Sequence, residues 1–327
     1  MKTGQIFATY DDAQGGPVLA GLCGDLLAAQ MTDWPRLREG YEALSAAKLR
    51  DIPCEGFSLK AQWNPQRMVS TAARLDPASI RARPCFLCPE NLPEAQRAIR
   101  YRRDFLILCN PAPIFTRHYT IAHVGHRPQA IEPVLELFLA LVEDLSPDFT
   151  VLYNGPQSGA SAPDHLHFQA APAGVLPVEA DLRAKQTRLL RKGMDGVDLF
   201  RAVGMGRAIL VLKGTEAGRV AAGLRKVMAA LRTVLNAKDE PMMNLLGSCE
   251  QGGWVILIFP RRKHRPDVFY LEGEARVLIT PAAVEMGGLL IAPREKDYHA
   301  LDAGLAQTIF QDVSVDEETV SRLVEIL

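Results

Sequence analysis

The sequence predicts an α+β fold, and three observations lead to that prediction. Short segments in which apolar and polar residues alternate indicate strands, because successive side chains of a strand point to opposite faces. Longer segments with apolar residues three and four positions apart indicate helices. Both kinds of segment mix along the 327 residues without the regular strand–helix alternation of a doubly wound sheet. This length allows two ordinary domains or one large one.

The composition is that of a chain with a proper apolar core. Apolar residues make up 48% of the sequence and charged residues 23%, and the net charge is −1. We therefore expect neither a nucleic-acid backbone nor an anionic membrane as a partner. The first residues turn acidic quickly without the apolar run of a signal peptide, and no apolar run approaches the length of a membrane span. We expect a cytoplasmic protein.

The elements of the first half follow in order along the chain. Helical spacing over residues 17–48 predicts one or two helices, and alternation over 57–63 predicts a strand. Residues 67–74 are interpreted as a second strand, and residues 76–93 as a loop interrupted by prolines. The remaining predictions of this half are strands at 105–109, 119–123 and 149–153 and an amphipathic helix at 131–145.

The chain is expected to divide where prolines cluster between residues 172 and 177, giving domains of residues 1–172 and 173–327. The second part opens with a basic stretch, residues 183–192. It predicts a helix near 217–236 and strands near 241–247, 253–259 and 276–280. Because strand, loop, strand and helix recur in both parts, we expect a degenerate structural duplication.

Residues 164–169 read Asp-His-Leu-His-Phe-Gln, and they are the segment most informative about function. If the segment is extended, His165, His167 and Gln169 share one face, while the two apolar residues between them point into the core. Two imidazoles and an amide in a row can bind a metal or take part in phosphoryl chemistry. The alternative interpretation is a pair of structural histidines on a strand.

Two of the six cysteines, Cys85 and Cys88, lie close together in a spacing that lets both thiolates reach one zinc ion. A redox pair would lie at the start of a helix after a strand, but this pair lies between prolines. A buried, reduced pair is the other alternative. Tetrahedral zinc needs two more ligands, and the candidates are His118, His123, His126 and His165. We expect structural zinc that fixes the loop to the strand.

His167 would then be the free imidazole of the row. A neutral imidazole can attack phosphorus and form a covalent intermediate, which divides one displacement into two easier ones. Gln169 lies on the same predicted face and can donate a hydrogen bond to the transferring phosphoryl group. The small and hydroxyl residues Gly159 and Ser161 suit close contact with phosphate oxygens, although a tight turn is the simpler interpretation of that loop.

A basic run, Arg-Arg-Lys-His-Arg, occupies residues 261–265. Such a run is commonly a solvated loop. The functional alternative is a clamp for the phosphate of an acceptor or leaving group, in which Arg261 would make bidentate contacts.

These motifs resemble those of the galactose-1-phosphate uridylyltransferase and dinucleoside-polyphosphate phosphorylase branch of the histidine-triad superfamily. In that branch the last triad histidine is replaced by glutamine, as in the His-x-His-x-Gln of residues 165–169. Residues 85–91, Cys-Phe-Leu-Cys-Pro-Glu-Asn, are similar to its zinc-binding cysteine loop, and residues 103–105 resemble its Asn-Asp-Phe segment. The Gly-Ala-Ser-x-Pro loop at 159–163 is closer to the phosphorylases. The resemblance covers about residues 60–172 and is weak afterwards.

The resemblance implies an antiparallel sheet with helices in two histidine-triad-like halves, of which the second is degenerate. It makes His167 the nucleophile that is transiently nucleotidylated and Gln169 the residue that steadies the phosphoryl group. The chain departs from the family's pattern at Pro163-Asp164, where the family has a lone proline. The remaining roles that it implies are zinc ligation by Cys85, Cys88, His126 and His165, and substrate contacts by Asn154 and Asp104.

The resemblance therefore predicts a nucleotidyltransferase of carbohydrate metabolism, similar to hexose-1-phosphate uridylyltransferases. The donor would be a nucleoside diphosphate sugar or a dinucleotide, and the acceptor a sugar phosphate. A phosphorylase that uses inorganic phosphate is the alternative within the enzyme class. A zinc-stabilised nucleotide-binding protein without turnover is the alternative outside it. The site could be built from two halves of one chain or from a homodimer.

Overall fold

The computed structural model describes residues 3–11, 16–71, 76–184, 189–194 and 196–327. The strands of its large sheet are β1 (Ile6–Tyr10), β4 (Ala98–Tyr101), β5 (Phe105–Cys109), β6 (Tyr119–His123), β7 (Phe149–Asn154), β8 (His167–Pro172), β9 (Leu189–Met194), β10 (Val197–Ala202), β11 (Ile209–Gly214), β12 (Met243–Glu250) and β13 (Gly253–Pro260). Within the described residues these eleven strands lie in the order β1-β4-β5-β6-β8-β7-β12-β13-β11-β10-β9. β1 and β4 are parallel, and the other neighbours are antiparallel. The predicted α+β class is confirmed.

The order of the strands contains the same unit twice. In the first half, β4, β5 and β6 are followed by α5 (Leu135–Leu145) and then by β7 and β8, which gives the sheet order 4-5-6-8-7. In the second half, β9, β10 and β11 are followed by α7 (Ala217–Leu235) and then by β12 and β13, which gives 9-10-11-13-12. The halves join through the β7–β12 pair. The two predicted halves are therefore present, and β13 is the counterpart of β8.

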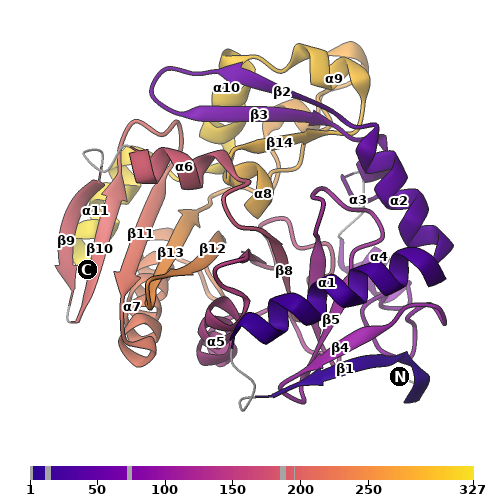
Figure 1. Cartoon of the computed structure of the whole chain (residues 1–327). Helices are drawn as coiled ribbons and strands as arrows, with labels where there is room; N and C mark the ends of the chain where they lie inside the picture. Colours follow the sequence, from indigo (N-terminus) through magenta and orange to yellow (C-terminus); the bar gives the residue numbers. More distant parts are fainter. Residues whose placement is uncertain (1–2, 12–15, 72–75, 185–188, 195) are drawn as a thin grey trace.

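A second, three-stranded sheet ties the beginning of the chain to its end. It consists of β2 (Lys48–Pro53), β3 (Ser58–Trp63) and β14 (Leu289–Ala292), in the order β14-β3-β2. β14 runs parallel to β3, so a strand of the predicted second domain pairs with one of the first. Figure 1 shows this sheet beside α10 (Ala303–Val313), at the top of the view. The boundary at residue 172 stays a prediction.

Helices cover the large sheet on both faces in the second half but mainly on one face in the first. α1 (Gly16–Asp33), α5, α7 and α11 (Glu317–Ile326) contribute to one continuous apolar core. α6 (Pro177–Ala184), α8 (Ala283–Met286), α10 and the small sheet contribute to a second core on the other face. The remaining helices among the described residues are η1 (Thr3–Gln5), α2 (Pro35–Ser45), η2 (Pro65–Arg67), α3 (Met68–Thr71), α4 (Pro77–Arg81), η3 (Glu132–Val134), η5 (Asp267–Phe269), η6 (Gly273–Ala275) and α9 (Glu295–Ala300).

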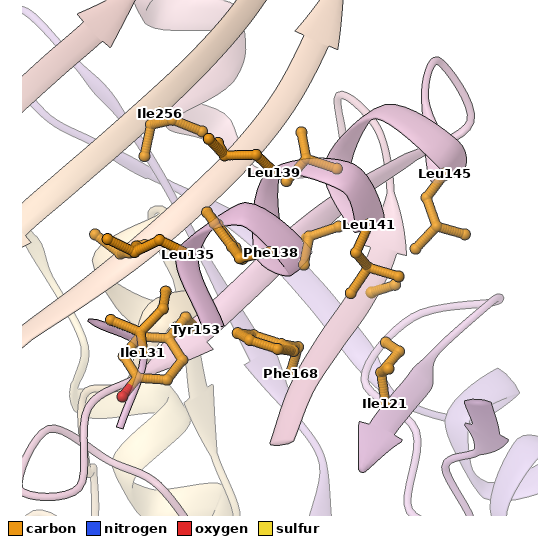
Figure 2. Packing of buried hydrophobic residues seen from close by; sticks show 14 of the residues in the cluster. Ile121, Ile131, Leu135, Phe138, Leu139, Leu141, Leu145, Tyr153, Phe168 and Ile256 are labelled. Atoms are coloured by element: carbon orange, nitrogen blue, oxygen red, sulfur yellow. The ribbon is translucent and has the colours of Figure 1, made fainter. Parts of the chain in front are cut away.

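One residue of the first core is Phe168, which lies between His167 and Gln169 in the sequence. Figure 2 shows Phe168 beneath α5, close to Phe138 and Tyr153. The ring centroids of Phe168 and Phe138 are 5.5 Å apart, and Phe168 is only 1% exposed. Because strand side chains alternate, burying Phe168 under α5 turns the flanking histidine and glutamine toward the opposite face of the sheet.

Two predicted strands are wrong. Residues 65–71 form η2 and α3 instead of a strand, and residues 72–74 lie outside the described residues. Residues 276–280 are in no strand, because their backbone groups form hydrogen bonds with partners outside any strand. The N–H of Leu278, for example, donates to the side chain of Asp297 at 2.9 Å. The predicted basic stretch at 183–192 falls partly outside the described residues.

Candidate active site and metal centre

A cleft of about 630 Å³ opens on the face of the first-half sheet opposite α5. Strand β8 contributes His167 and Gln169 to its lining, and the preceding loop contributes Ser161. The rest of the lining comes from α2 and the residue before it, η2, the cysteine loop with the residues around it, β5 with the loop after it, and β6. Three residues that the sequence predicts to take part in catalysis or substrate binding therefore meet in one cavity.

The imidazole of His167 is held in one tautomer. Its Nδ1 lies 2.8 Å from the carbonyl oxygen of His165, which can only accept, so Nδ1 carries the proton. Burial lowers the pKa of His167 to about 4, so the ring is neutral at pH 7. The Nε2 atom then has a free lone pair, as an attack on phosphorus requires.

The backbone of His167 is fixed by the side chain of Gln129. The ladder between β7 and β8 ends at the pair of Leu152 and Gln169, so the two strands separate beyond it. Gln129 fills the space: its Nε2 donates to the carbonyls of Asn154 and His167 at 2.8 and 3.0 Å. Its Oε1 accepts from the N–H of His167 at 2.8 Å. No pattern in the sequence points to this glutamine, because an isolated amide in a loop carries no local signal.

Four predicted metal ligands come together beside the cleft. The potential ligand atoms of Cys85, Cys88, His126 and His165 all lie within 4.8 Å of one another. His165 Nδ1 is 3.3 Å from the sulfur of Cys85 and 3.6 Å from that of Cys88, and His126 Nδ1 is 3.2 Å from Cys88. Zn–S and Zn–N bonds of about 2.3 and 2.0 Å place S and N about 3.5 Å apart in a tetrahedron. The cluster can therefore hold a metal ion.

The second nitrogen of each histidine in this cluster faces an acceptor. His165 Nε2 lies 2.7 Å from the carbonyl of His123, and His126 Nε2 lies 3.5 Å from a carboxylate oxygen of Asp164. Each contact favours a proton on Nε2 and leaves Nδ1 free to bind a metal, as acceptors behind metal-binding histidines commonly do. Asp164, the residue by which the chain departs from the family's pattern, therefore lies directly behind a candidate ligand.

Histidines 118 and 123, the other candidate metal ligands, have different partners. His118 is fully buried, and its Nε2 lies 2.8 Å from Oε1 of Gln169. His123 Nδ1 is in contact with the backbone of Gly125, whose N–H lies 2.8 Å away. Neither belongs to the cluster with the two cysteines.

Four other predicted substrate-binding residues do not line the cleft. Asp104 is exposed in the turn between β4 and β5, and Asn154 Oδ1 accepts from Asn244 and from the N–H of Ala283 at 2.8 and 2.7 Å. Gly159 has a φ of +93°, and a Cβ there would lie 2.7 Å from that of Ala282, so this glycine allows a close approach of two loops.

Arg261, the fourth, is a buried structural cation, and the structure does not bring it to the cleft. It is 0% exposed, and burial lowers its pKa to about 9. Its guanidinium donates to Asn244 Oδ1 at 2.6 Å and to the carbonyls of Val313, Pro281, Lys263 and His264. The clamp predicted for this arginine is therefore replaced by a network that holds the loop after β13.

Other cations line the cleft, and no motif in the sequence points to them. Arg67 on η2 donates to the carbonyl of Ala112 at 2.9 Å, and Arg83 donates to that of Ser161 at 3.0 Å. The guanidinium of Arg83 also lies 5.0 Å from the ring of Phe86, which is 44% exposed. Arginines scattered over the sequence give no local signal, and only the fold brings these two together.

Two family models match the chain, one in each half. Residues 26–172 match a domain of unknown function, DUF4922, and residues 182–327 match the GDPGP1-like, C-terminal domain. Each model covers slightly less than half of the chain. No curated protein matches the sequence.

The chain is similar to solved structures of the yeast Ap4A phosphorylase Apa2. The complex with AMP aligns with a TM-score of 0.57 and 14% identity, and covers 86% of this chain and 95% of that chain. The complex with Ap4A aligns with a TM-score of 0.55 and 15% identity, over 86% and 96% of the two chains. This chain has the Ap4A phosphorylase fold. The predicted likeness to these phosphorylases is thereby confirmed for the fold, which is what identities this low show.

No helix among the described residues combines the length and apolarity that crossing a membrane requires.

Proposed function

We propose that this chain is a nucleotidyltransferase that acts through a covalent nucleotidyl-histidine on His167. The observation that carries the proposal is the unprotonated Nε2 of a neutral, tautomer-locked imidazole in a cleft that also contains Gln169 and arginines. An imidazole with its other nitrogen held by an acceptor is suited to nucleophilic attack.

In the first step, Nε2 of His167 attacks the α-phosphorus of the donor. A P–N bond forms, the bond from phosphorus to the bridging oxygen breaks, and the leaving phosphate takes the electron pair. In the second step an oxygen of the acceptor phosphate attacks the same phosphorus and the P–N bond breaks. The Nδ1 proton stays on His167 throughout, and the carbonyl of His165 stabilises the positive charge on the ring while phosphorus is attached.

Charge in the cleft favours a polyanionic substrate. Three arginines, Arg36, Arg67 and Arg83, line it together with one carboxylate, Glu39. Arginine gives fork-like contacts to phosphate oxygens and keeps its charge in a buried site. A dinucleoside polyphosphate or a nucleoside diphosphate sugar carries the required negative charge, and the exposed ring of Phe86 offers a surface on which a base can stack.

We propose that the metal bound by the cysteine loop is zinc, in a structural role. The residues that would hold it are Cys85, Cys88, His126 and His165, a Cys₂His₂ set with soft and borderline donors that suits this ion. Zinc would fix the cysteine loop against the segment that precedes His167.

The second candidate is a phosphorylase, in which inorganic phosphate is the acceptor. The Ap4A phosphorylase fold favours it, because the yeast relative carries that activity in its name. In both reactions the nucleotidyl-histidine is the same, so the acceptor alone separates them. A zinc-stabilised nucleotide-binding protein would bind the nucleotide and never form the intermediate.

Labelling with α-³²P substrates tests the proposal. A panel of dinucleoside polyphosphates and nucleoside diphosphate sugars is incubated with the wild type, His167→Gly and His299→Asn, and the protein is denatured in alkali, where a P–N bond survives. His299 is an exposed residue of α9 and serves as the control. We expect label on the wild type and the control and none on His167→Gly. Label that persists on His167→Gly would contradict the assignment.

The labelled enzyme is then given either inorganic phosphate or a hexose 1-phosphate. Release of a labelled nucleoside diphosphate by inorganic phosphate identifies a phosphorylase, and formation of a labelled sugar nucleotide identifies a transferase. A wild type that is thermally stabilised by nucleotide but never labelled would be a binding protein.

A further inference from the structure

His118 and Gln169 are neighbours across two paired strands. Thr120 of β6 pairs directly with Gln169 of β8. His118 lies two residues before Thr120 on the same face, which makes it the diagonal neighbour of Gln169. The imidazole is 0% exposed, and its Nε2 is 2.8 Å from Oε1 of Gln169.

The position of the proton on His118 follows from its other contact. The backbone N–H of Ile114 points at Nδ1 from 3.2 Å, so Nδ1 must be an acceptor without a proton. Burial lowers the pKa of His118 to about 3, and the ring is therefore neutral near pH 7. The single proton of the ring lies on Nε2, and it is donated to Gln169.

This hydrogen bond decides which end of the Gln169 amide faces the substrate. The amide oxygen is taken up by His118, so the NH₂ group is the end left for the cleft. Among the described residues, none accepts a hydrogen bond from that NH₂ group. An amide turned the other way would present its oxygen to the oxygens of a phosphoryl group, which would repel it. A donor in a fixed orientation stabilises developing phosphoryl charge without reorganising.

We propose that His118 is a positioning residue for nucleotidyl transfer, which orients the amide of Gln169 so that its NH₂ group points to the phosphoryl group on His167. The inference rests on the proposed function. His118 does not touch the substrate; it acts through Gln169.

Two substitutions separate this role from a structural one. His118→Gln places an amide NH₂ near the position of Nε2 and keeps a donor for Gln169, but it loses the acceptor for the N–H of Ile114. His118→Asn places an amide oxygen near the position of Nδ1 and keeps that acceptor, but it loses the donor. The rate of label transfer to His167 is measured in single turnovers for both variants and for Gln169→Ala, together with kcat and KM.

We expect His118→Asn to form the intermediate at least about 10-fold more slowly than the wild type with little change in KM, because one oriented donor is lost from the charged transition state. We expect His118→Gln to recover most of that rate. In a Gln169→Ala background, His118→Asn should cause no further loss. If His118→Asn labels as fast as the wild type, or if it is slowed equally with and without Gln169, the positioning role is refuted.

The control is the wild type in the same assay. A wild type that takes up no label refutes the proposed function, whereas a labelled wild type with indistinguishable Asn and Gln variants refutes only the role of His118. Circular dichroism and thermal unfolding of each variant identify a loss of folding. If a variant is partly unfolded, the labelling rates of His118→Asn and His118→Gln are calculated per mole of folded protein, and their ratio decides between the positioning role and a structural role.

Discussion

Burial of a neutral histidine makes the free energy of unfolding depend on pH, and His118 provides a test of this. The ring accepts from Ile114, donates to Gln169, and is fully buried, so the described residues offer no acceptor for a second proton. In the unfolded chain the same residue takes up a proton with a pKa of about 6.5. The folded state therefore binds fewer protons than the unfolded state in the range between the two pKa values, and stability falls as the pH falls.

The size of the effect follows from the two pKa values. The folded pKa is lowered to about 3, so below pH 6.5 each pH unit costs the folded state about 1.4 kcal/mol. Between pH 7 and pH 5 the contribution of His118 is a loss of about 2 kcal/mol. His118→Asn removes this term. We expect the variant to be less stable than the wild type at pH 7, and the gap to narrow by about 2 kcal/mol at pH 5.

The assay is urea unfolding of both proteins at pH 7 and at pH 5, in the same buffer and with the same metal content. Other titrating groups are common to both proteins and cancel in the difference between the two pH values. A difference in unfolding free energy that is the same at both pH values would refute the neutral, buried histidine. So would a gap that widens at pH 5.

Three further predictions concern the metal cluster and the core. In metal analysis, Cys88→Ser and Cys85→Ser should each contain far less zinc than the one ion per chain expected for the wild type. In thermal unfolding, a chelator should lower the Tm of the wild type but not that of either variant. Phe168→Ala should cost about 3–5 kcal/mol in urea unfolding because it empties the space beneath α5, whereas Phe168→Leu should cost less. Gly247→Ala should cost about 1–3 kcal/mol because its Cβ would lie 2.6 Å from Val142, and a neutral or stabilising result would contradict the close packing of α5 on β12.

Local patterns are sufficient for short, strongly apolar strands and for an amphipathic helix. The strands at 105–109 and 119–123 have the predicted bounds, and the helix at 131–145 differs only in a first turn that is 3-10. The predicted strands are wrong over residues 67–71, which are helical, and over residues 276–280, which are in no strand, because alternation over a few residues does not decide the backbone conformation. A strand needs a partner whose backbone donors and acceptors face its own.

The small sheet shows the same limit over a longer distance. β14 pairs with β3 although more than two hundred residues separate them in the sequence, and no local feature of either segment predicts this pairing. The charge of the run at residues 261–265 predicts a solvated loop or a phosphate clamp, but the fold buries Arg261 and satisfies its donors with carbonyl groups and Asn244. Whether a charged side chain is solvated, binds a ligand or is held by buried acceptors depends on its position in the fold.

The α+β class, the two halves and the residue types of the candidate site can be predicted from the amino-acid sequence. Spacing on a single strand fixes that His167 and Gln169 share a face, and the resemblance named the four potential metal ligands. The groups that meet that face depend on the fold: Gln129 binds the backbone of His167, His118 binds the amide of Gln169, and arginines line the same cleft. The reason is that alternation along a strand is a property of the local backbone, whereas proton positions and amide orientation depend on hydrogen-bond partners that folding brings from elsewhere in the chain.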